Sequence, residues 1–463
     1  MLRQPKRIFV RTGFAMTMAV LAVASLTACE TRRSTVQTQT PLIIDQDEAD
    51  LPTEVRVGVL LPLTGPAAEL GQDMLRAAQM ALFDAGPNTV VLMPKDTRGS
   101  ADGAANAALE LVDEGAEVLI GPLFSQAVRA VTPIARAADV RVLAFSNVSA
   151  VADEGTYLLG FRPEEQVERV VQYALDQGVE IFAGLAPDDA YGETAMRALQ
   201  DAVIERGGIM GEVHFYPPTL DDPSSVVREV ADYRKRQAAL EAERRILEAM
   251  GEEDEVAQAV LKQIESLDTF GEPPFDAIMI ADGSDRLRSV ASLLTFYDVD
   301  PEAVQFLGTI RWQDDPRVLS EEAIAGGWFA ASSPEAFAAF EGRFDTVFDK
   351  KPEQLASLAY DATALAVIVQ RDLDDRRFDP VSLTDTEGFA GATGLFRLKP
   401  DGLAQHGLAV LEVANGAISE IDPTPIRFED EPIDDPFFGS GDGSFGGFFG
   451  QDQQAVPNPP LTQ

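Results

Sequence analysis

The residues of this chain that could carry out chemistry are few and scattered. There are two histidines among 463 residues, His214 and His406, and they stand in unrelated contexts. No cluster of His and Cys has the spacing of a metal site, and the sequence contains neither a phosphate-binding loop of the Walker type nor the nucleophile elbow of hydrolases. Carboxylates are too numerous for any pair to stand out as an acid–base couple. The sequence therefore predicts a binding protein rather than an enzyme, with no metal and no cofactor.

One glycine motif falls in the C-terminal segment. The run "GDGSFG" satisfies G-x-G-x-x-G, but no strand precedes it and no helix follows it, so we do not interpret it as a nucleotide site. It belongs to residues 429–463, which are rich in Gly, Asp and Pro and which we predict to be a disordered tail. The tail carries five phenylalanines in a glycine-rich context, and a sticky recognition segment is the alternative interpretation: Phe437, Phe438, Phe445, Phe448 and Phe449.

Cys29 is the single cysteine, so it can form neither an internal disulfide nor a Cys-based metal site. Before it stand a basic start and the apolar run "FAMTMAVLAVASL", which has the length of a secretory signal and is short for a membrane span. The ending "LTAC" resembles the bacterial lipoprotein signal. We therefore expect residues 1–28 to be a signal peptide, Cys29 to be lipidated, and residues 29–53 to be a flexible tether. An ordinary signal peptide with an incidental cysteine is the alternative.

Charge excludes one class of partner. The chain has 37 Lys and Arg against 76 Asp and Glu, a net charge of −39. Removing the four basic residues of the signal leaves a net charge of −43. Such a surface repels nucleic acid and anionic lipid, so we predict no nucleic-acid binding.

Between the two ends, short apolar runs alternate with amphipathic stretches. "VRVGVLLPL", "EVLIGPL" and "RVLAFSN" have the pattern of buried strands, and helix-like segments such as "GQDMLRAAQMALFDAG" separate them. A second series follows, with "EIFAGLAP", "MGEVHFYP" and "DAIMIADG" as strands. Alternation of this kind indicates parallel sheets with helices on both faces. The sequence predicts an α/β protein with two lobes.

Residues 228–271 interrupt this alternation. They are rich in Glu, Arg, Ala and Leu, with a "GEED" break, and predict a hairpin of two helices. The hairpin is interpreted either as a solvated excursion or as a surface that docks a partner. Eight apolar residues are expected in the seam between its helices: Leu240, Ile246, Leu247, Met250, Val256, Val260, Leu261 and Ile264.

Nine segments in order resemble the leucine/isoleucine/valine-binding family, which has the type I periplasmic-binding fold. Among them are "LLPLTGPAAELGQDMLRAAQ", "EVLIGPLFSQAVRAVTPIARAADVRVLAFSN", "DDAYGETAMRAL" and "GFAGATGLFRLKPDG", and the resemblance covers about residues 54–428. It implies a first lobe from 54–162 and 309–388. It also implies a second lobe from 163–308, which holds the 228–271 hairpin, and from 389–428.

This resemblance also places a ligand site in the cleft between the lobes. Ser125, the serine after the Gly-Pro turn, would lie at a helix N-terminus, where free backbone N–H groups suit a carboxylate of the ligand. At position 150 this chain has alanine, whereas the amino-acid binders that it resembles carry a threonine at that position. The alternative is that these residues only cap loops and helices. The expected cleft residues are Ser125, Ser146, Asn147 and Ser149 on the first lobe and Tyr191 and Asp282 on the second.

Other features are similar to the lipoproteins called penicillin-binding protein activators. These are the charged insert "YRKRQAALEAERRILEAM", the segment "LASLAYDA" and the ending "FRLKPDGLAQHGLAVLEVANGAISEIDPTPIRF". The likeness implies a partner, a peptidoglycan synthase, contacted from a lipid anchor in the periplasm, on the outer or inner membrane of a Gram-negative bacterium. The alternative is the substrate-binding component of an amino-acid or amide ABC transporter, with an amino-acid-like ligand in the cleft.

Overall fold

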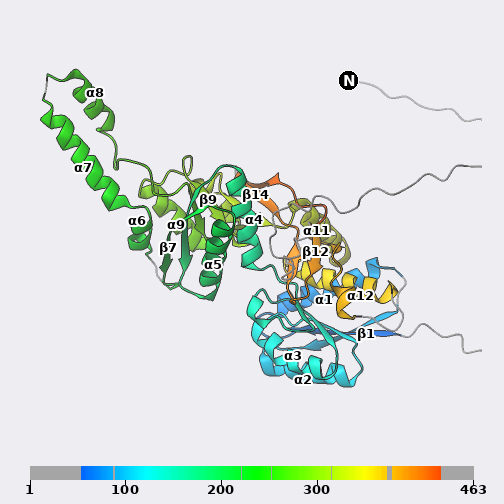
Figure 1. Ribbon diagram of the computed structural model, residues 1–463. Coiled ribbons are helices and arrows are strands. Elements are labelled where there is room, and N and C mark those ends of the chain that lie inside the picture. The colour runs from blue at the N-terminus through cyan, green and yellow to red at the C-terminus, as the bar shows by residue number, and fades with distance from the viewer. Residues whose placement is uncertain are drawn as a thin grey trace, which may run out of the picture. The chain divides into compact units, whose positions relative to one another are not determined.

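A computed structural model describes residues 54–86, 89–219, 222–251, 253–313, 315–372, 378–414 and 416–428 (Figure 1). The predicted signal peptide, Cys29, the tether and the 429–463 tail lie outside the described residues. Within them, two helix-covered sheets define two lobes. The α/β prediction is confirmed.

The first lobe is built on a five-stranded parallel sheet. In spatial order its strands are β2 (Val90–Asp96), β1 (Val55–Leu61), β3 (Val118–Ile120), β4 (Arg141–Ala144) and β5 (Thr156–Leu158). Helices α1 (Ala68–Asp84) and α12 (Ala356–Asp372) pack on one face, and α2 (Ala101–Asp113) and α3 (Ser125–Ala137) pack on the other. Burial of both faces explains why β1 is apolar at nearly every position, with Arg56 as its exposed exception.

The second lobe is built on a seven-stranded mixed sheet. Its parallel strands, in spatial order, are β7 (Ile209–Tyr216), β6 (Ile181–Pro187), β8 (Ala277–Ile280), β9 (Gln305–Gly308) and β10 (Trp328–Ala331), and the antiparallel pair β14 (Ala409–Ala414) and β15 (Ala417–Asp422) continues the sheet beyond β10. One face is covered by α4 (Pro163–Asp176) and α5 (Ala190–Glu205). The other is covered by α6 (Ser224–Val230), α9 (Ser284–Phe296), η2 (Ile310–Gln313), α10 (Pro316–Leu319) and η3 (Glu322–Ile324).

The segment boundaries differ from those expected. Strand β10 lies inside 309–388, yet it pairs with β9 and β14 of the second lobe. The chain therefore rejoins the first lobe after β10, where α11 (Pro334–Phe348) and α12 pack against α1. The run of β10 is only four residues long and has no polar alternation, so its sequence does not indicate which sheet it joins.

Residues 389–428 also divide between the lobes. After α13 (Pro380–Leu383), a small antiparallel sheet of β11 (Phe389–Gly391), β12 (Gly394–Leu398) and β13 (Ala404–His406) packs into the first-lobe core. The whole segment was expected in the second lobe, but only its strands β14 and β15 join that lobe's sheet.

The helical hairpin is formed by α7 (Tyr233–Ala249) and α8 (Glu255–Ile264). Its small core is separate from that of the sheet and contains five of the expected seam residues: Leu240, Leu247, Val260, Leu261 and Ile264. The other three, Ile246, Met250 and Val256, are exposed, so their assignment to the seam was wrong. Leu240 and Leu247 are seven residues apart and share a helix face, whereas Ile246 and Met250 lie on another face of the same helix.

Candidate functional site

The predicted first-lobe residues lie at the carboxyl ends of the neighbouring strands β3 and β4. Ser125 is the first residue of α3, whose N-cap position, Phe124, makes no side-chain capping bond. Asn147 is exposed, and Ser149 begins the single turn η1 (Ser149–Val151). Two chain segments, one after each strand, thus bring hydroxyl and amide groups to one edge of this sheet, where ligands bind in open α/β sheets.

Two of these serines have internal partners. Ser146 is buried, and its Oγ accepts a hydrogen bond from the backbone N–H of Val148 at 3.2 Å. Ser149 Oγ donates to Glu164 Oε1 at 2.6 Å, while Oε2 of the same carboxylate is buried without a hydrogen-bond partner among the described residues. The loop-capping interpretation therefore describes Ser146, and Ser149 connects the first-lobe edge to the start of α4.

The predicted second-lobe residues follow the neighbouring strands β6 and β8. Tyr191 lies in the first turn of α5, where Asp189 caps the helix, and its hydroxyl donates to Thr309 Oγ1 at 2.8 Å. Asp282 lies between β8 and α9 and is 1% exposed. Both predicted residues are therefore at the expected edge of the sheet.

Asp282 is fully engaged by its neighbours. Arg286 donates two hydrogen bonds to the Asp282 carboxylate in a bidentate arrangement, with Nε 2.7 Å from Oδ2 and Nη2 3.0 Å from Oδ1. Tyr216 also donates its hydroxyl to Oδ2 at 2.7 Å, and the backbone N–H of Gly283 donates to Oδ1 at 2.8 Å. The hydrogen bond with Asp282 raises the pKa of Arg286, and burial followed by the nearby Asp282 charge raises the pKa of Tyr216. Asp282 is thus a buried structural anion whose charge Arg286 compensates.

Sequence reasoning missed Arg311. It lies in η2, directly after β9, which is the next strand of the sheet beside β8. Its guanidinium carbon lies 3.9 Å from the centre of the Tyr191 ring. The rule that placed Tyr191 and Asp282 at strand ends applies equally to "LGTIRW", so this residue was within reach of the sequence. Arg311 and Asp282 line a cavity of about 330 Å³ together with Gly283, Ser284, Asp285 and Arg286.

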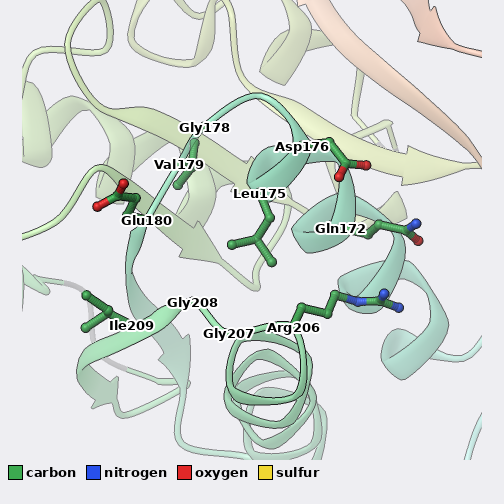
Figure 2. A pocket seen from close by; sticks show the side chains of 10 residues that line it. All are labelled: Gln172, Leu175, Asp176, Gly178, Val179, Glu180, Arg206, Gly207, Gly208 and Ile209. Atoms are coloured by element: carbon green, nitrogen blue, oxygen red, sulfur yellow. The ribbon is translucent and has the colours of Figure 1, made fainter. Parts of the chain in front are cut away.

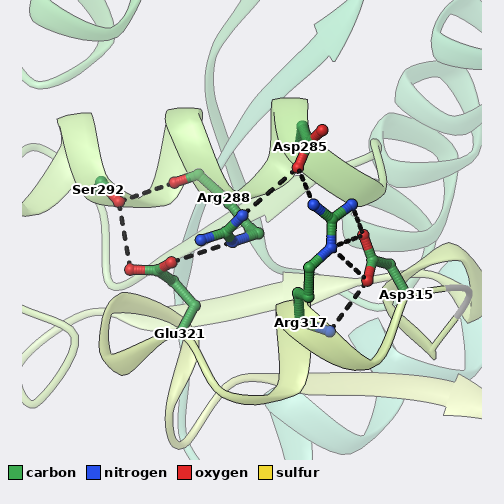
Figure 3. A network of polar contacts seen from close by, with 6 residues as sticks. All are labelled: Asp285, Arg288, Ser292, Asp315, Arg317 and Glu321. Carbon is green, nitrogen blue, oxygen red and sulfur yellow. Dashed lines mark hydrogen bonds and ion pairs between the residues drawn. The ribbon is translucent and has the colours of Figure 1, made fainter.

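A chain of ion pairs borders this cavity and joins α9 to α10 and to the N-cap residues of α10 and η3, Asp315 and Glu321 (Figure 3). Arg317 binds Asp315 with its Nη2 at 2.6 Å, and Arg288 Nε lies 3.2 Å from Glu321. Asp285 faces both arginines at 3.3–3.4 Å. Pairs this exposed contribute little stability individually, but they fix the positions of the segments that carry the cavity.

A buried pair joins α4 to the small antiparallel sheet. His406 Nδ1 lies 2.9 Å from Glu165 Oε1, and Arg162 Nη2 donates to the carbonyl of Ala404 at 3.0 Å. Burial opposes ionisation of Glu165, but His406 and Arg162 outweigh it and lower the pKa of this carboxyl. His406, a candidate for chemistry on sequence alone, is thus half of a structural pair. His214, on β7, faces Glu212 at 2.9 Å and belongs to neither edge.

Another cavity, of about 490 Å³, lies away from these residues (Figure 2). It is formed where α4 leads into β6 and α5 leads into β7, at the amino ends of these strands. Its walls combine three glycines and three apolar side chains with Gln172, Asp176, Glu180 and Arg206, and Arg206 is paired with Glu168. It brings together none of the predicted residues.

The described residues contain no group of three or more His, Cys, Asp or Glu arranged to hold a metal ion. None of their helices combines the length and the apolar character that crossing a bilayer requires.

Comparison with known proteins gives the family. The profile of the periplasmic binding proteins matches residues 54–417. This chain belongs to that family. The two-lobed fold also resembles a putative branched-chain amino acid ABC transporter protein from Rhodospirillum rubrum, with a TM-score of 0.63 at 19% identity, over 80% of this chain and 100% of that one. At this identity the likeness concerns the fold alone.

Two curated relatives match part of this periplasmic binding protein. A protein of Rickettsia prowazekii (strain Madrid E) is 26% identical over 180 residues, 39% of this chain and 48% of the relative. The Leu/Ile/Val-binding protein homolog 6 of Brucella abortus (strain 2308) is 27% identical over 188 residues, 38% of this chain and 48% of the relative. The chain thus spans about half the length of the curated relatives it matches.

Proposed function

We propose that this chain is the solute-binding component of an importer and holds a small organic ligand, such as an amino acid, between the two sheet edges. The observation that carries the proposal is the placement of polar residues after neighbouring parallel strands in both lobes: β3 and β4 in the first, β6, β8 and β9 in the second. Ligands of open α/β sheets bind at such edges. The Brucella relative, named for binding Leu, Ile and Val, supports the amino-acid class.

In this proposal the protein binds without catalysing a reaction, in the periplasm. Asp282 and Arg286, at the second-lobe edge, are committed to a structural pair with each other. Groups held in this way orient a ligand but do not exchange protons readily with it.

A thermal-shift screen of the purified full-length chain against amino acids, amides and organic acids tests this function. A ligand present at 100 times its dissociation constant adds about 2.7 kcal/mol of stability, which is roughly 5–10 °C for lobes of this size. A shift with at least one class of compound is the expected result. Silence across the whole panel would contradict solute binding.

Regulation of a peptidoglycan synthase, a penicillin-binding protein, is the second candidate. The observation that favours a protein partner is the exposed apolar surface of the hairpin at Ile246, Met250 and Val256. Replacing all three with Glu should leave folding intact because these side chains make no core contacts. If the hairpin binds a synthase, this variant loses its effect on the purified synthase and on cell shape. Wild-type behaviour in both assays would remove this candidate.

We also propose that a lipid on Cys29 anchors the protein to a membrane on its periplasmic side. Cys29→Ser should release the protein from the membrane fraction of fractionated cells, because acylation needs the thiol. Unchanged membrane association of this variant would argue against the anchor.

A further inference from the structure

Arg311 differs from the other arginines around the second-lobe cavity because no carboxylate in the described part of the chain pairs with it. Among the described residues, Arg286, Arg288 and Arg317 each contact an aspartate or glutamate. Arg311 makes a face contact with the Tyr191 ring, and the described part of the chain offers its guanidinium no ion pair or hydrogen bond. It is half-buried and lines the cavity.

The position of Arg311 is fixed by the residues on either side. Trp312 is fully buried and donates its indole N–H to the carbonyl of Ile280 at 3.1 Å. The backbone N–H of Ile310 donates to Gln166 Oε1, on α4, at 2.9 Å. A side chain between two such anchors, with its guanidinium on an aromatic ring, loses less conformational entropy on binding than a free surface arginine.

The carboxylates near Arg311 are occupied. Asp282 is gripped by Arg286 and Tyr216, and Asp189 caps α5 by accepting from two backbone N–H groups at 2.9–3.0 Å. Asp285 stands at the cavity wall, but its side chain is 72% exposed and faces Arg288 and Arg317. This wall therefore offers an unmatched cation and no unmatched buried anion.

We propose that the second lobe binds an anionic group of the ligand through Arg311, so that the solute is an organic anion whose carboxylate, or a group of the same shape, faces this cavity. This inference rests on the proposed solute-binding function and names its substrate class. The guanidinium presents a planar set of donors that matches a carboxylate in two-pronged geometry. A ligand that carries only an ammonium group finds no available partner on this wall.

The test compares matched compounds that share one hydrocarbon skeleton. 4-Methylpentanoate is leucine without its ammonium group, and 3-methylbutylamine is leucine without its carboxylate. Binding of each, and of L-leucine, is measured by calorimetry on the full-length protein and on three variants: Arg311→Gln, Arg311→Lys and Arg234→Gln. Arg234 is exposed on α7 and gives the same change in net charge far from the cavity in sequence and contact.

We expect 4-methylpentanoate to bind and 3-methylbutylamine not to bind. Arg311→Gln should weaken 4-methylpentanoate about 10- to 100-fold, the usual loss for a charged hydrogen-bond partner. Arg311→Lys should retain part of the affinity because it keeps the charge but loses the planar donor set. Arg234→Gln should bind as the wild type does. The near-ultraviolet circular dichroism of the two second-lobe tryptophans, Trp312 and Trp328, verifies that the Arg311 variants keep the local fold.

The outcomes separate the two proposals. If the amine or neutral amides bind as well as the acid, or if Arg311→Gln leaves acid binding unchanged, solute binding stands and the role of Arg311 is overturned. If the wild type binds none of the probes and no compound of the thermal-shift panel, solute binding fails and the inference falls with it.

Discussion

The two sheet edges differ in the way they hold their polar groups. On the first lobe the predicted groups are neutral, three hydroxyls and the amide of Asn147, and Ser146 makes one bond with a nearby backbone amide. On the second lobe, Asp282 and Arg286 are charged, and each makes several bonds with the other and with their neighbours. A neutral edge costs little to rearrange, whereas the buried Asp282–Arg286 pair is rigid because separating its charges would be expensive. The second lobe is therefore where we expect most of the electrostatic selectivity.

The largest effect should come from breaking the second-lobe pair. Arg286→Met leaves the Asp282 carboxylate buried beside Tyr216 without its cation. We expect a loss of about 2–3 kcal/mol in the free energy of unfolding, below the full value for a buried pair because the Arg286 side chain is 41% exposed. Denaturant unfolding monitored by circular dichroism measures it. The double variant Arg286→Met/Asp282→Leu, which removes both charges, is the control and should recover part of the loss.

A buried carboxyl of the first lobe provides the second prediction. Asp361, on α12, is 4% exposed and accepts hydrogen bonds from the backbone N–H of Ala392 and from Thr393. Burial raises its pKa to about 7, against an ordinary value near 3.8. Between these values the unfolded chain releases a proton that the folded chain retains. Stability from this residue is therefore intact below about pH 4, falls as the pH rises, and is lost above about pH 7.

Asp361→Asn should remove this dependence. We expect the variant to gain about 1–2 kcal/mol over the wild type at pH 8 and to gain nothing at pH 4, since the amide keeps one acceptor but ionises at neither pH. Melting temperatures across pH 4–8 measure the difference. Glu165 should show the opposite sign, because His406 lowers its pKa and its contribution is lost as the pH falls. Parallel melting curves for wild type and Asp361→Asn at every pH would refute the assignment.

The first-lobe edge should tolerate change better than the second. Ser146→Ala removes the single acceptor of the Val148 amide, and we expect a loss of about 1 kcal/mol in the free energy of unfolding. The same unfolding assay used for Arg286→Met gives a direct comparison. If Ser146→Ala lowered the free energy of unfolding as much as Arg286→Met does, the two edges would not differ in rigidity as we propose.

The smallest effect is expected on the hairpin, which belongs to neither edge. Val256 is 74% exposed, so Val256→Gln should change stability by no more than about 0.5 kcal/mol. Leu247→Ala in the hairpin core should cost about 2 kcal/mol. Limited proteolysis should cleave the hairpin faster in Leu247→Ala than in the wild type, and at the wild-type rate in Val256→Gln. Equal sensitivity of both variants would mean that Val256 is covered by another part of the protein.

Apolar runs that alternate with amphipathic stretches were sufficient to predict the two α/β lobes, whereas the cleft residues were expected from the family resemblance. Tyr191 and Asp282 follow buried strands, and parallel strands bring their ends together. The pairing was harder to predict: Arg286 is four residues after Asp282, a helical spacing, but the sequence around it holds many other charges. The crossing of the chain between the lobes at β10 could not be predicted, because four apolar residues, three of them buried, carry no information about which sheet they join.

The two tryptophans of the chain, Trp312 and Trp328, both lie in the second lobe. Trp312 is fully buried next to Arg311, and Trp328 packs edge-on against Tyr173 with 5.0 Å between ring centres. Intrinsic tryptophan emission is consequently a spectroscopic label for one lobe only. Unfolding of the first lobe alone would leave the tryptophan emission unchanged but would alter the far-ultraviolet circular dichroism. The two signals together therefore distinguish the unfolding of each lobe without an added probe.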